Sequence, residues 1–219
     1  MSIMVVGDIH GKWGLTNLLI EREHPDMILQ VGDFGWWPRM EGVCWKLKGL
    51  ELGDARLHFC DGNHEDHPSL LEHSNQQTAP AELYKGVVYQ PRGSTIQLPD
   101  GRTVLFMGGA YSIDGQYRTV GNDWFPVEEL ISQKDFSRLP DCKVDIVISH
   151  TCPSCMVPVR ERYGTDSCEK ALDAILDIYH PSLWYFGHWH TIAEGVEKGG
   201  CRWFCLNDIP NHGCWRWIS

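Results

Sequence analysis

The stretch Met4-Val5-Val6-Gly7-Asp8-Ile9-His10-Gly11 decides the fold. An apolar run ends there in a carboxylate, an imidazole and two glycines, which is typical of a buried strand leading into a tight turn and a helix. In extended backbone Asp8 and His10 point to the same side, with Cα atoms roughly 6.6 Å apart at ~3.3 Å per residue. Both side chains can therefore bind one cation. Taken alone, the stretch fits equally well with Asp8 as a helix N-cap and His10 as a turn histidine.

The length and composition predict one globular domain over residues 1–219. Apolar residues make up 42% of the chain and charged residues 22%, which is ordinary for a protein with a substantial core. No run approaches the ~18 apolar residues of a membrane span. The first residues carry no basic region and no small-residue cleavage site. We therefore expect a cytoplasmic protein with no membrane association.

The charge balance argues against one class of partner. The net charge is −10, from 19 Lys+Arg against 29 Asp+Glu. Proteins that coat duplex nucleic acid gain their affinity by neutralising phosphates with basic side chains, so we expect no such binding. A small phosphorylated ligand, or a nucleic-acid end drawn to a locally positive site, is still compatible with this charge.

The nine cysteines are an odd number in a chain without a visible secretory signal, so reduced thiols are expected. Cys152-Pro-Ser-Cys155 has the spacing of a metal or redox motif, and Cys201 and Cys205 follow. A structural zinc or a thiol-redox role is therefore an alternative hypothesis. The spacing of the second pair is poor for a zinc knuckle.

Apolar runs that end in polar residues recur along the chain. Strands are predicted over 27–31, 57–60, 144–149 and 183–186. A helix over 13–23 joins the strand that ends before Gly7 to the strand over 27–31, which makes these two strands a parallel pair. Further helices are predicted near 40–52, 68–73 and 126–131, and the clearest over 166–179, with Asp166 or Ser167 as its cap. The runs 87–90, 95–98 and 102–107 predict an antiparallel meander, and closing antiparallel strands are expected up to residue 218.

Five of these strand ends carry candidate metal ligands, because side chains at the carboxyl ends of α/β strands converge on one crevice. The candidates are Asp8, His10, Asp33, Asn63, His150, His188 and His190, with His64 beside Asn63. Carboxylate, imidazole and amide oxygen suit a borderline divalent metal such as Mn, Fe, Zn or Co. Seven ligands are too many for one ion, so one carboxylate must bridge two ions ~3.5–4 Å apart. The filled site would be positive and would suit a phosphoryl group.

The blocks Gly-Asp-Ile-His-Gly, Gly-Asp, Gly-Asn-His-Glu, Ser-His and Gly-His-Trp-His occur in that order over residues 7–190. Together they resemble the calcineurin-like metallophosphoesterase superfamily. The resemblance implies an α/β fold, a four-layer αββα sandwich of two mixed sheets flanked by helices. It also implies a hydrolase with two divalent metal ions, manganese foremost and Fe, Zn, Ni or Co as alternatives.

The same resemblance implies a role for each candidate. Two ligand triads would each hold one metal, and these are Asp8, His10 and His190 for the first and Asn63, His150 and His188 for the second. Asp33 would bridge the two ions. His64 resembles the family's catalytic histidine, which protonates the leaving oxygen as general acid while a hydroxide that bridges the metals attacks the phosphorus.

One region departs from the phosphoprotein-phosphatase branch of this superfamily. That branch has Asp-Arg-Gly after its second block, whereas this chain reads Gly35-Trp36-Trp37-Pro38-Arg39. The carboxylate that orients the catalytic histidine and the neighbouring arginine are therefore absent from that place. The remaining pattern is similar to the phosphodiesterase-like branch, which includes lariat-debranching enzymes and small bacterial and phage phosphoesterases. Debranching enzymes carry Cys where this chain has Asp8, so two full metal sites are expected here.

These observations predict hydrolysis of a phosphodiester in a nucleotide or a nucleic-acid end. The alternatives are a phosphomonoesterase acting on nucleotides or phosphoproteins, and a binding module that keeps the metal fold without catalysis. Candidate substrate residues are Arg39, Tyr111 and Arg118, since an arginine can bind phosphate through two hydrogen bonds. Trp36, Trp37 and Trp189 could stack on bases or pack in the core. The natural substrate and the oligomeric state are left open.

Overall fold

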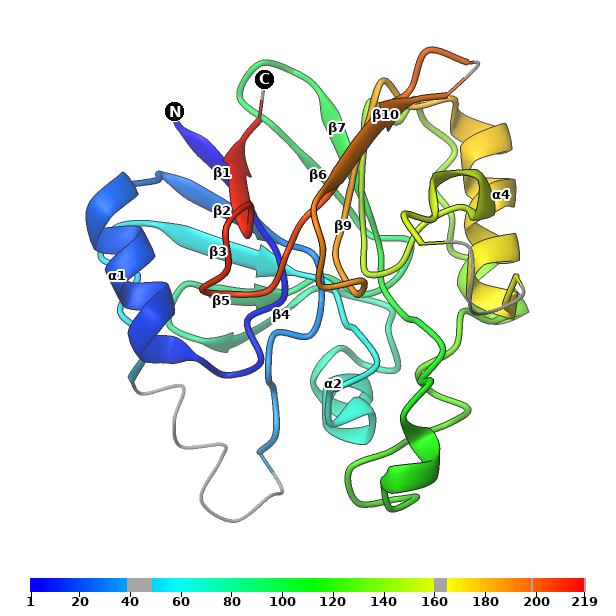
Figure 1. Cartoon of the computed structure of the whole chain (residues 1–219), viewed down its shortest axis with the longest axis horizontal. Coiled ribbons are helices and arrows are strands. Elements are labelled where there is room, and N and C mark those ends of the chain that lie inside the picture. The colour runs from blue at the N-terminus through cyan, green and yellow to red at the C-terminus, as the bar shows by residue number, and fades with distance from the viewer. Residues whose placement is uncertain (39–48, 160–164, 198, 219) are drawn as a thin grey trace.

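Two mixed sheets of six strands each pack face to face in the computed structural model, which describes residues 1–38, 49–159, 165–197 and 199–218 (Figure 1). The first sheet contains β1 (Ile3–Val6), β2 (Met27–Gln30), β3 (Arg56–Phe59), β4 (Ala81–Tyr84), β5 (Val87–Tyr89) and β12 (Trp215–Trp217). The second contains β6 (Thr95–Gln97), β7 (Thr103–Met107), β8 (Ile146–Ser149), β9 (Leu183–Phe186), β10 (Ala193–Val196) and β11 (Arg202–Cys205).

Both sheets follow the same plan, with four parallel strands in the middle and an antiparallel strand at each edge. The strand orders are β12-β1-β2-β3-β5-β4 and β10-β11-β9-β8-β7-β6. Strands β1, β8 and β9 are buried at every position, as parallel strands covered on both faces require. The parallel strands of each sheet therefore deliver their carboxyl ends to one edge.

Helices cover the two outer faces and complete four layers (Figure 1). Helix α1 (Trp13–Glu23) packs on the first sheet and α4 (Ser167–Tyr179) on the second. Shorter helices are α2 (His67–His73), α3 (Gln133–Phe136), η2 (Gly115–Tyr117) and η3 (Ser154–Met156). The four-layer αββα sandwich predicted from the sequence is confirmed.

Alternating side chains of each strand fill separate cores. In β1, Met4 and Val6 pack under α1, whereas Ile3 and Val5 pack between the sheets. In β8, Val147 faces α4 while its neighbours Ile146 and Ile148 face the first sheet. This period of two explains why the strands read as unbroken apolar runs, since both of their faces are buried.

Several predicted elements are confirmed by the structure. Helix α1 spans 13–23 and β9 spans 183–186, as predicted. The side chain of Asp166 caps α4 by accepting hydrogen bonds from Cys168 N at 2.7 Å and Glu169 N at 2.9 Å. The predicted helix near 40–52 falls mainly on residues outside the described ranges, and residues 50–52 are not helical.

Two predictions for the middle of the chain are wrong. Residues 126–131 form turns instead of a helix, because the carbonyls of Glu128, Glu129 and Leu130 accept hydrogen bonds from the buried guanidinium of Arg92. The meander over 87–107 is wrong at its first strand, whereas the antiparallel pairing of its last two strands is confirmed. Strand β5 pairs with β3 in the first sheet, whereas β6 and β7 pair in the second. The intervening residues carry the chain from one sheet to the other, and the edge strand β4 was not predicted.

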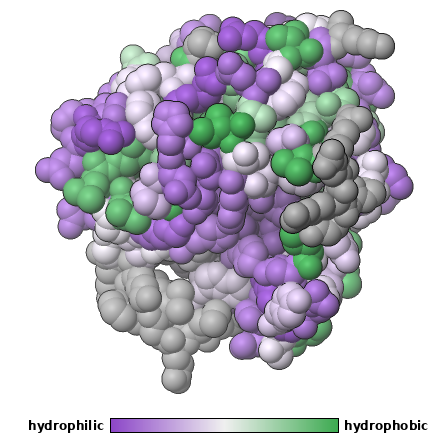
Figure 2. Space-filling model, in the orientation of Figure 1, coloured by the Kyte–Doolittle hydropathy of each residue, from purple (hydrophilic) through white to green (hydrophobic). Residues whose placement is uncertain are grey.

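Within the described ranges, no helix combines the length and the apolar character that crossing a membrane requires. Figure 2 shows a largely hydrophilic face, interrupted by separate hydrophobic patches.

A buried histidine of β3 predicts one pH effect on stability. Burial, and then the charge of Arg56, lower the pKa of His58 to about 4, and its Nδ1 lies 2.9 Å from Gln90 Nε2. Unfolded His58 binds a proton as the pH falls below about 6.5, whereas folded His58 does so only near pH 4. The contribution of neutral His58 to the free energy of unfolding is therefore intact above pH 6.5 and is lost as the pH falls towards 4, with a full loss of roughly 3 kcal/mol.

In His58→Gln, urea unfolding with EDTA should show a shallower loss of stability between pH 6.5 and 4.5 than in wild type. Parallel losses in the two proteins would contradict this assignment.

Candidate metal centre

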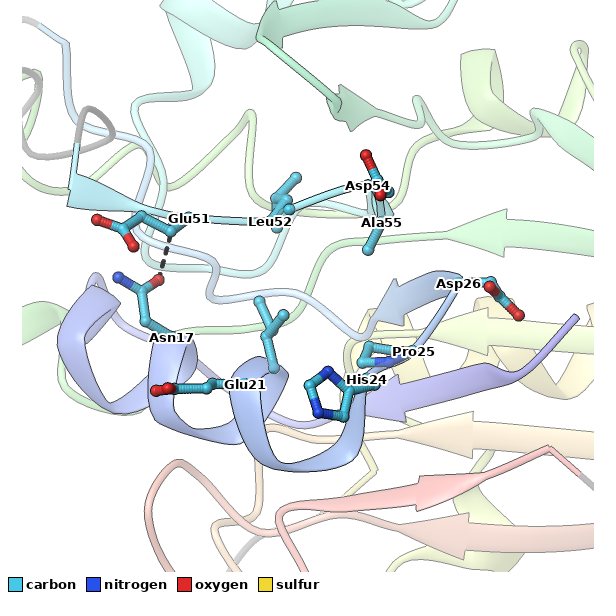
Figure 3. Close-up of a pocket in the computed structure, with 11 residues that line it drawn as sticks. Asn17, Glu21, His24, Pro25, Asp26, Glu51, Leu52, Asp54 and Ala55 are labelled. Atoms are coloured by element: carbon cyan, nitrogen blue, oxygen red, sulfur yellow. Dashed lines mark hydrogen bonds between the residues drawn. The ribbon is translucent and has the colours of Figure 1, made fainter.

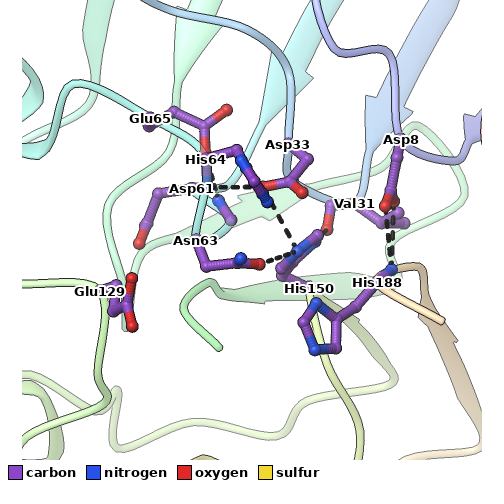
Figure 4. A network of polar contacts seen from close by, with 12 residues as sticks. Asp8, Val31, Asp33, Asp61, Asn63, His64, Glu65, Glu129, His150 and His188 are labelled. Atoms are coloured by element: carbon purple, nitrogen blue, oxygen red, sulfur yellow. Dashed lines mark hydrogen bonds and ion pairs between the residues drawn. The ribbon is translucent and has the colours of Figure 1, made fainter. Parts of the chain in front are cut away.

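The seven predicted ligands follow the carboxyl ends of five parallel strands, and Figure 4 shows five of them, Asp8, Asp33, Asn63, His150 and His188. Adjacent strands of the first sheet carry four of these side chains, and adjacent strands of the second sheet carry the other three. Asp8 and His10 follow β1, Asp33 follows β2, Asn63 follows β3, His150 follows β8, and His188 and His190 follow β9. The sequence prediction that these residues share one crevice agrees with this placement.

Asp8, His10 and His190 form the first group of donors. His190 Nε2 lies 3.0 Å from Asp8 Oδ2 and 3.2 Å from His10 Nε2. His10 Nε2 is 3.9 Å from Asp8 Oδ2. Three lone-pair donors thus face a common point, which is the arrangement that a divalent cation needs.

Asp33, His150 and Asn63 form a second group of donors, and the ring of His188 lies beside it. His150 Nε2 lies 3.4 Å from Asp33 Oδ1 and 3.0 Å from Asn63 Oδ1. The rings of His150 and His188 are 4.9 Å apart between centroids. Asp33 Oδ2 also lies 3.7 Å from His10 Nε2, so this carboxylate reaches both groups. Asp8 does too, since one oxygen of Asp8 lies within 4.8 Å of donors from Asp33 and His150.

The backbone at these ligands is unusual. Four of the seven have left-handed conformations, with φ between 44° and 67°, and these are His10, Asp33, His188 and His190. Residues with side chains adopt this region at an energetic cost, and such residues cluster at functional sites where the surroundings hold them.

Two glycines allow the carboxylates to approach the neighbouring backbone. A Cβ on Gly62 would lie 2.0 Å from Asp33 Oδ1, and a Cβ on Gly187 would lie 2.0 Å from Asp8 Oδ1. Any larger residue would displace the carboxylate. Both glycines belong to the blocks that the sequence singled out.

The charges of the site call for a positive partner. The side chains of Asp8 and Asp33 are 0% and 2% exposed. Burial raises the pKa of Asp33, but His150 outweighs burial and holds it well below its usual range. Burial likewise lowers the pKa of His150, but Asp33 raises it to about 10. Without a metal the pair is thus an ion pair in the protein interior. A divalent ion would supply the same positive charge to carboxylates that are otherwise costly to bury.

Hydrogen bonds to the backbone aim the donors. His150 Nδ1 lies 3.0 Å from the carbonyl of Val31, which turns Nε2 towards Asp33. The amide of His188 donates to both oxygens of Asp8 at 3.1 and 3.2 Å, and the amide of His64 donates to Asp33 Oδ1 at 2.8 Å. The donor types, their convergence and their orientation fit a site for divalent metals.

Glu65 is a residue of the site to which sequence reasoning gave no role. Its buried carboxylate accepts hydrogen bonds from Gly62 N at 2.7 Å and Gly35 N at 3.1 Å. Burial, and then the charge of Asp33, raise the pKa of Glu65 to about 8. One carboxyl group therefore joins the loops that carry Asp33 and Asn63. Its place in the Gly-Asn-His-Glu block was the available signal.

His64 lies beside the donor cluster with its side chain 33% exposed. Its ring centroid is 5.5 Å from that of His10, and burial is the largest influence that lowers its pKa. Its Nε2 is 3.5 Å from Asp114 Oδ2, and Arg118 pairs with Asp114 at 3.6 Å. A carboxylate and a guanidinium thus lie next to His64 although the region of Gly35 lacks both. They come from a different loop, which the sequence blocks did not reveal.

The predicted substrate residues have different positions. Tyr111 is 49% exposed and lines the cleft above the ligands. The side chain of Arg118 is 8% exposed and donates to Ser112 Oγ at 3.0 Å, to the carbonyl of Asn63 at 3.2 Å and to the carbonyl of Asp123. Arg39 lies outside the described residues.

The cleft that contains the site has a volume of about 760 Å³. Its lining includes the polar residues Asp33, Asn63 and His64. It also includes apolar side chains, of which Ile113 and Val159 are 55% and 49% exposed. The cleft therefore offers both polar and apolar surface.

The tryptophans divide between core and cleft. Trp36 is buried and donates to Ser69 Oγ at 3.1 Å, so it is a core residue. Trp189 lines the cleft. Trp37 is half-buried and is not among the cleft residues.

The zinc alternative is not supported by the described residues. Cys152 is buried and Cys155 exposed, and both are free thiols. In the described part of the chain, the groups of three or more ionisable donors close enough for one ion contain Asp and His but no Cys.

A second groove, of about 610 Å³, lies between α1 and residues 51–55 (Figure 3). Its carboxylates include Glu21, Glu51 and Asp54, and Asn17 Oδ1 accepts a hydrogen bond from Glu51 N at 2.9 Å. Its described residues form no donor group close enough for one ion. In the described part of the chain, the candidate donor groups lie at the carboxyl ends of the strands.

Comparisons with known proteins bear on the fold and on the family. Phosphopantetheinyl hydrolase (PptH) from Mycobacterium tuberculosis aligns with a TM-score of 0.57 at 15% identity, over 99% of this chain and 95% of that one. The protein TT1561 of Thermus thermophilus aligns with a TM-score of 0.54 at 14% identity, over 94% and 89%. These structures share the fold, and the curated proteins give no match. The family model for calcineurin-like phosphoesterases matches residues 1–191. The chain therefore belongs to the calcineurin-like phosphoesterase family.

Proposed function

We propose that this protein, a metal-dependent phosphoesterase by family, uses two metal ions to hydrolyse phosphodiesters of nucleotides or nucleic-acid ends. The observation that carries the proposal is the clustering of the seven predicted ligands, two of them buried carboxylates, at strand ends where four of the seven line an open cleft. Such a cluster of buried charge and strained backbone costs folding energy, which a catalytic metal centre explains.

The ligands divide between two ions in this proposal. The first ion is held by Asp8, His10 and His190, the second by Asn63, His150 and His188, and Asp33 lies between them. Two divalent ions bound here would supply Lewis acidity, which lowers the pKa of water and offsets the charge on phosphoryl oxygens. Manganese is the first ion to test, since Asp, His and Asn donors accept several divalent metals.

His64 acts as the general acid in this proposal. It is partly exposed at the edge of the donor cluster, where it can meet a leaving oxygen. Asp114, at 3.5 Å from its Nε2, favours the protonated imidazole, as a neighbouring carboxylate does. A histidine that gives its proton to the leaving group lowers the barrier most when that group is a poor one.

Two features favour a diester over a monoester. The guanidinium of Arg118 is engaged with the protein itself, and none of the described residues that line the cleft is a lysine or an arginine. A diester carries a single negative charge, which the metals can offset, whereas a monoester dianion gains more from an added cation. The exposed ring of Tyr111 offers a stacking surface for a nucleobase.

Metal content tests the assignment of Asp33. Asp33→Asn removes the charge that both donor groups share, so manganese bound per chain should fall from two ions to one or none. Turnover should fall by more than about 100-fold. The matched control is Asp54→Asn, which changes an exposed carboxylate of the second groove. This variant should keep both ions. Two ions retained in Asp33→Asn, measured by elemental analysis after dialysis, would refute the bridging role.

Substrate preference tests the diester assignment. After chelation and refilling with Mn²⁺, the protein should cleave bis-p-nitrophenyl phosphate with a higher kcat/KM than p-nitrophenyl phosphate, because the cleft has apolar surface for a second organic group. Faster monoester cleavage would support the phosphomonoesterase alternative. Two bound metals without cleavage of either ester would favour the binding module.

Leaving-group dependence tests His64. His64→Ala should keep both metals but lose about 100-fold or more in kcat with an alkyl leaving group, and distinctly less with p-nitrophenolate, which leaves without protonation. Asp114→Asn should show the same pattern with a smaller loss. Equal losses for both leaving groups would show that His64 has another function.

A further inference from the structure

We propose that Ser112 and Glu129 are positioning residues that hold the Asn63 amide with its oxygen towards the metal site, and so set the affinity for the second metal. The inference rests on the proposed two-metal function. Neither residue belongs to the sequence blocks, and both are buried, at 3% and 1% exposure.

The asparagine must present one particular end. An amide oxygen can bind a metal, whereas an amide NH₂ group has hydrogens and no available lone pair. Asn63 Oδ1 lies 3.0 Å from His150 Nε2, on the side of the donor cluster. Asn63 Nδ2 points the other way and donates to Ser112 Oγ at 3.0 Å. A rotation of the amide by half a turn would remove one ligand of the second ion.

The hydroxyl of Ser112 makes every hydrogen bond that it can. A serine hydroxyl has one proton and two acceptor lone pairs. Its proton goes to Glu129 Oε2 at 2.8 Å. Its lone pairs accept from Asn63 Nδ2 and from Arg118 Nη1, both at 3.0 Å. With its proton committed to Glu129, Ser112 can only accept from Asn63, so the NH₂ end of the amide must face it.

Glu129 fixes the direction of this chain of hydrogen bonds. Its other oxygen, Oε1, accepts from Ser112 N at 3.1 Å and from Trp124 Nε1 at 3.2 Å. Its backbone carbonyl accepts from Arg92 Nη2 at 3.1 Å, so the turn that carries it is anchored in the core. Figure 4 shows the Glu129 carboxylate on the side of Asn63 opposite to His150.

Glu129→Gln would reverse the direction of these hydrogen bonds with almost no change in the shape of the side chain. If the amide oxygen of the new glutamine still accepts from Ser112 N and Trp124 Nε1, the glutamine NH₂ group faces the Ser112 hydroxyl. That hydroxyl must then donate its proton elsewhere, and Asn63 is the partner that can accept it by rotating its amide. The NH₂ end of Asn63 would face the second metal and could not bind it. Ser112→Ala instead leaves Asn63 without a partner on that side.

The test is a calorimetric titration of metal-free protein with Mn²⁺. Ser112→Ala and Glu129→Gln should each lower the affinity for the second Mn²⁺ ion by about 10–100-fold, which is the usual effect of losing a residue that orients a metal ligand. Binding of the first ion, held by Asp8, His10 and His190, should change by less than about twofold. Glu128→Gln, the neighbouring carboxylate, is the matched control and should bind both ions as wild type does. Unchanged affinities in both variants would overturn the inference.

A second readout requires no metal. In the metal-free protein, the Nδ2 protons of Asn63 should exchange with solvent about tenfold faster in Ser112→Ala than in Glu128→Gln, because a buried hydrogen bond is lost. NMR of the side-chain amide measures this exchange. If wild type binds fewer than two ions, the two-metal function fails, and the exchange rate still decides whether Ser112 holds the Asn63 amide. Equal exchange in both variants overturns it, even where two ions bind.

Discussion

Asp8 and Asp33 are two carboxylates buried at adjacent strand ends, and the rest of the site is arranged around their charge. Each would be strongly destabilising without compensation. Backbone amides of His188 and His64 donate to them, and Gly187 and Gly62 leave room for those contacts. The remaining negative charge requires a cation. The need to compensate two buried carboxylates therefore accounts for much of the arrangement of the site.

The two sheets contribute different chemistry to that solution. The first sheet supplies both carboxylates and the amide of Asn63, whereas the second supplies His150, His188 and His190. His10 is the exception, since it follows β1. Ions bound between these donors would join the two sheets at the edge where the parallel strands have their carboxyl ends. Metal binding and the packing of the sheets are thus coupled, because an ion that binds the folded chain stabilises it.

The sequence was informative wherever a strand is buried on both faces. A largely apolar run comes before each group of predicted ligands, and local pattern alone reveals such a run ending in Asp, Asn or His. It could not assign strands to sheets, since residues 87–107 have the pattern of a meander whichever sheet each strand joins. It also could not reveal contacts between distant loops. Arg92 prevents a helix at 128–130, and Glu129 reaches Asn63 across 66 positions of the chain, an approach that tertiary structure alone creates.

The segment Tyr111-Ser112-Ile113 has a consequence for how this protein can change its specificity. Its outer side chains are exposed in the cleft, and the one between them is buried against Asn63. Substitutions at 111 and 113 can therefore alter the cleft surface freely. A gain or loss of one residue just before this segment would instead exchange the roles, turning the hydroxyl outward and a large apolar side chain into the space beside the metal ligand. The length of this loop is constrained by the metal site, although its outward surface is free to vary with the substrate.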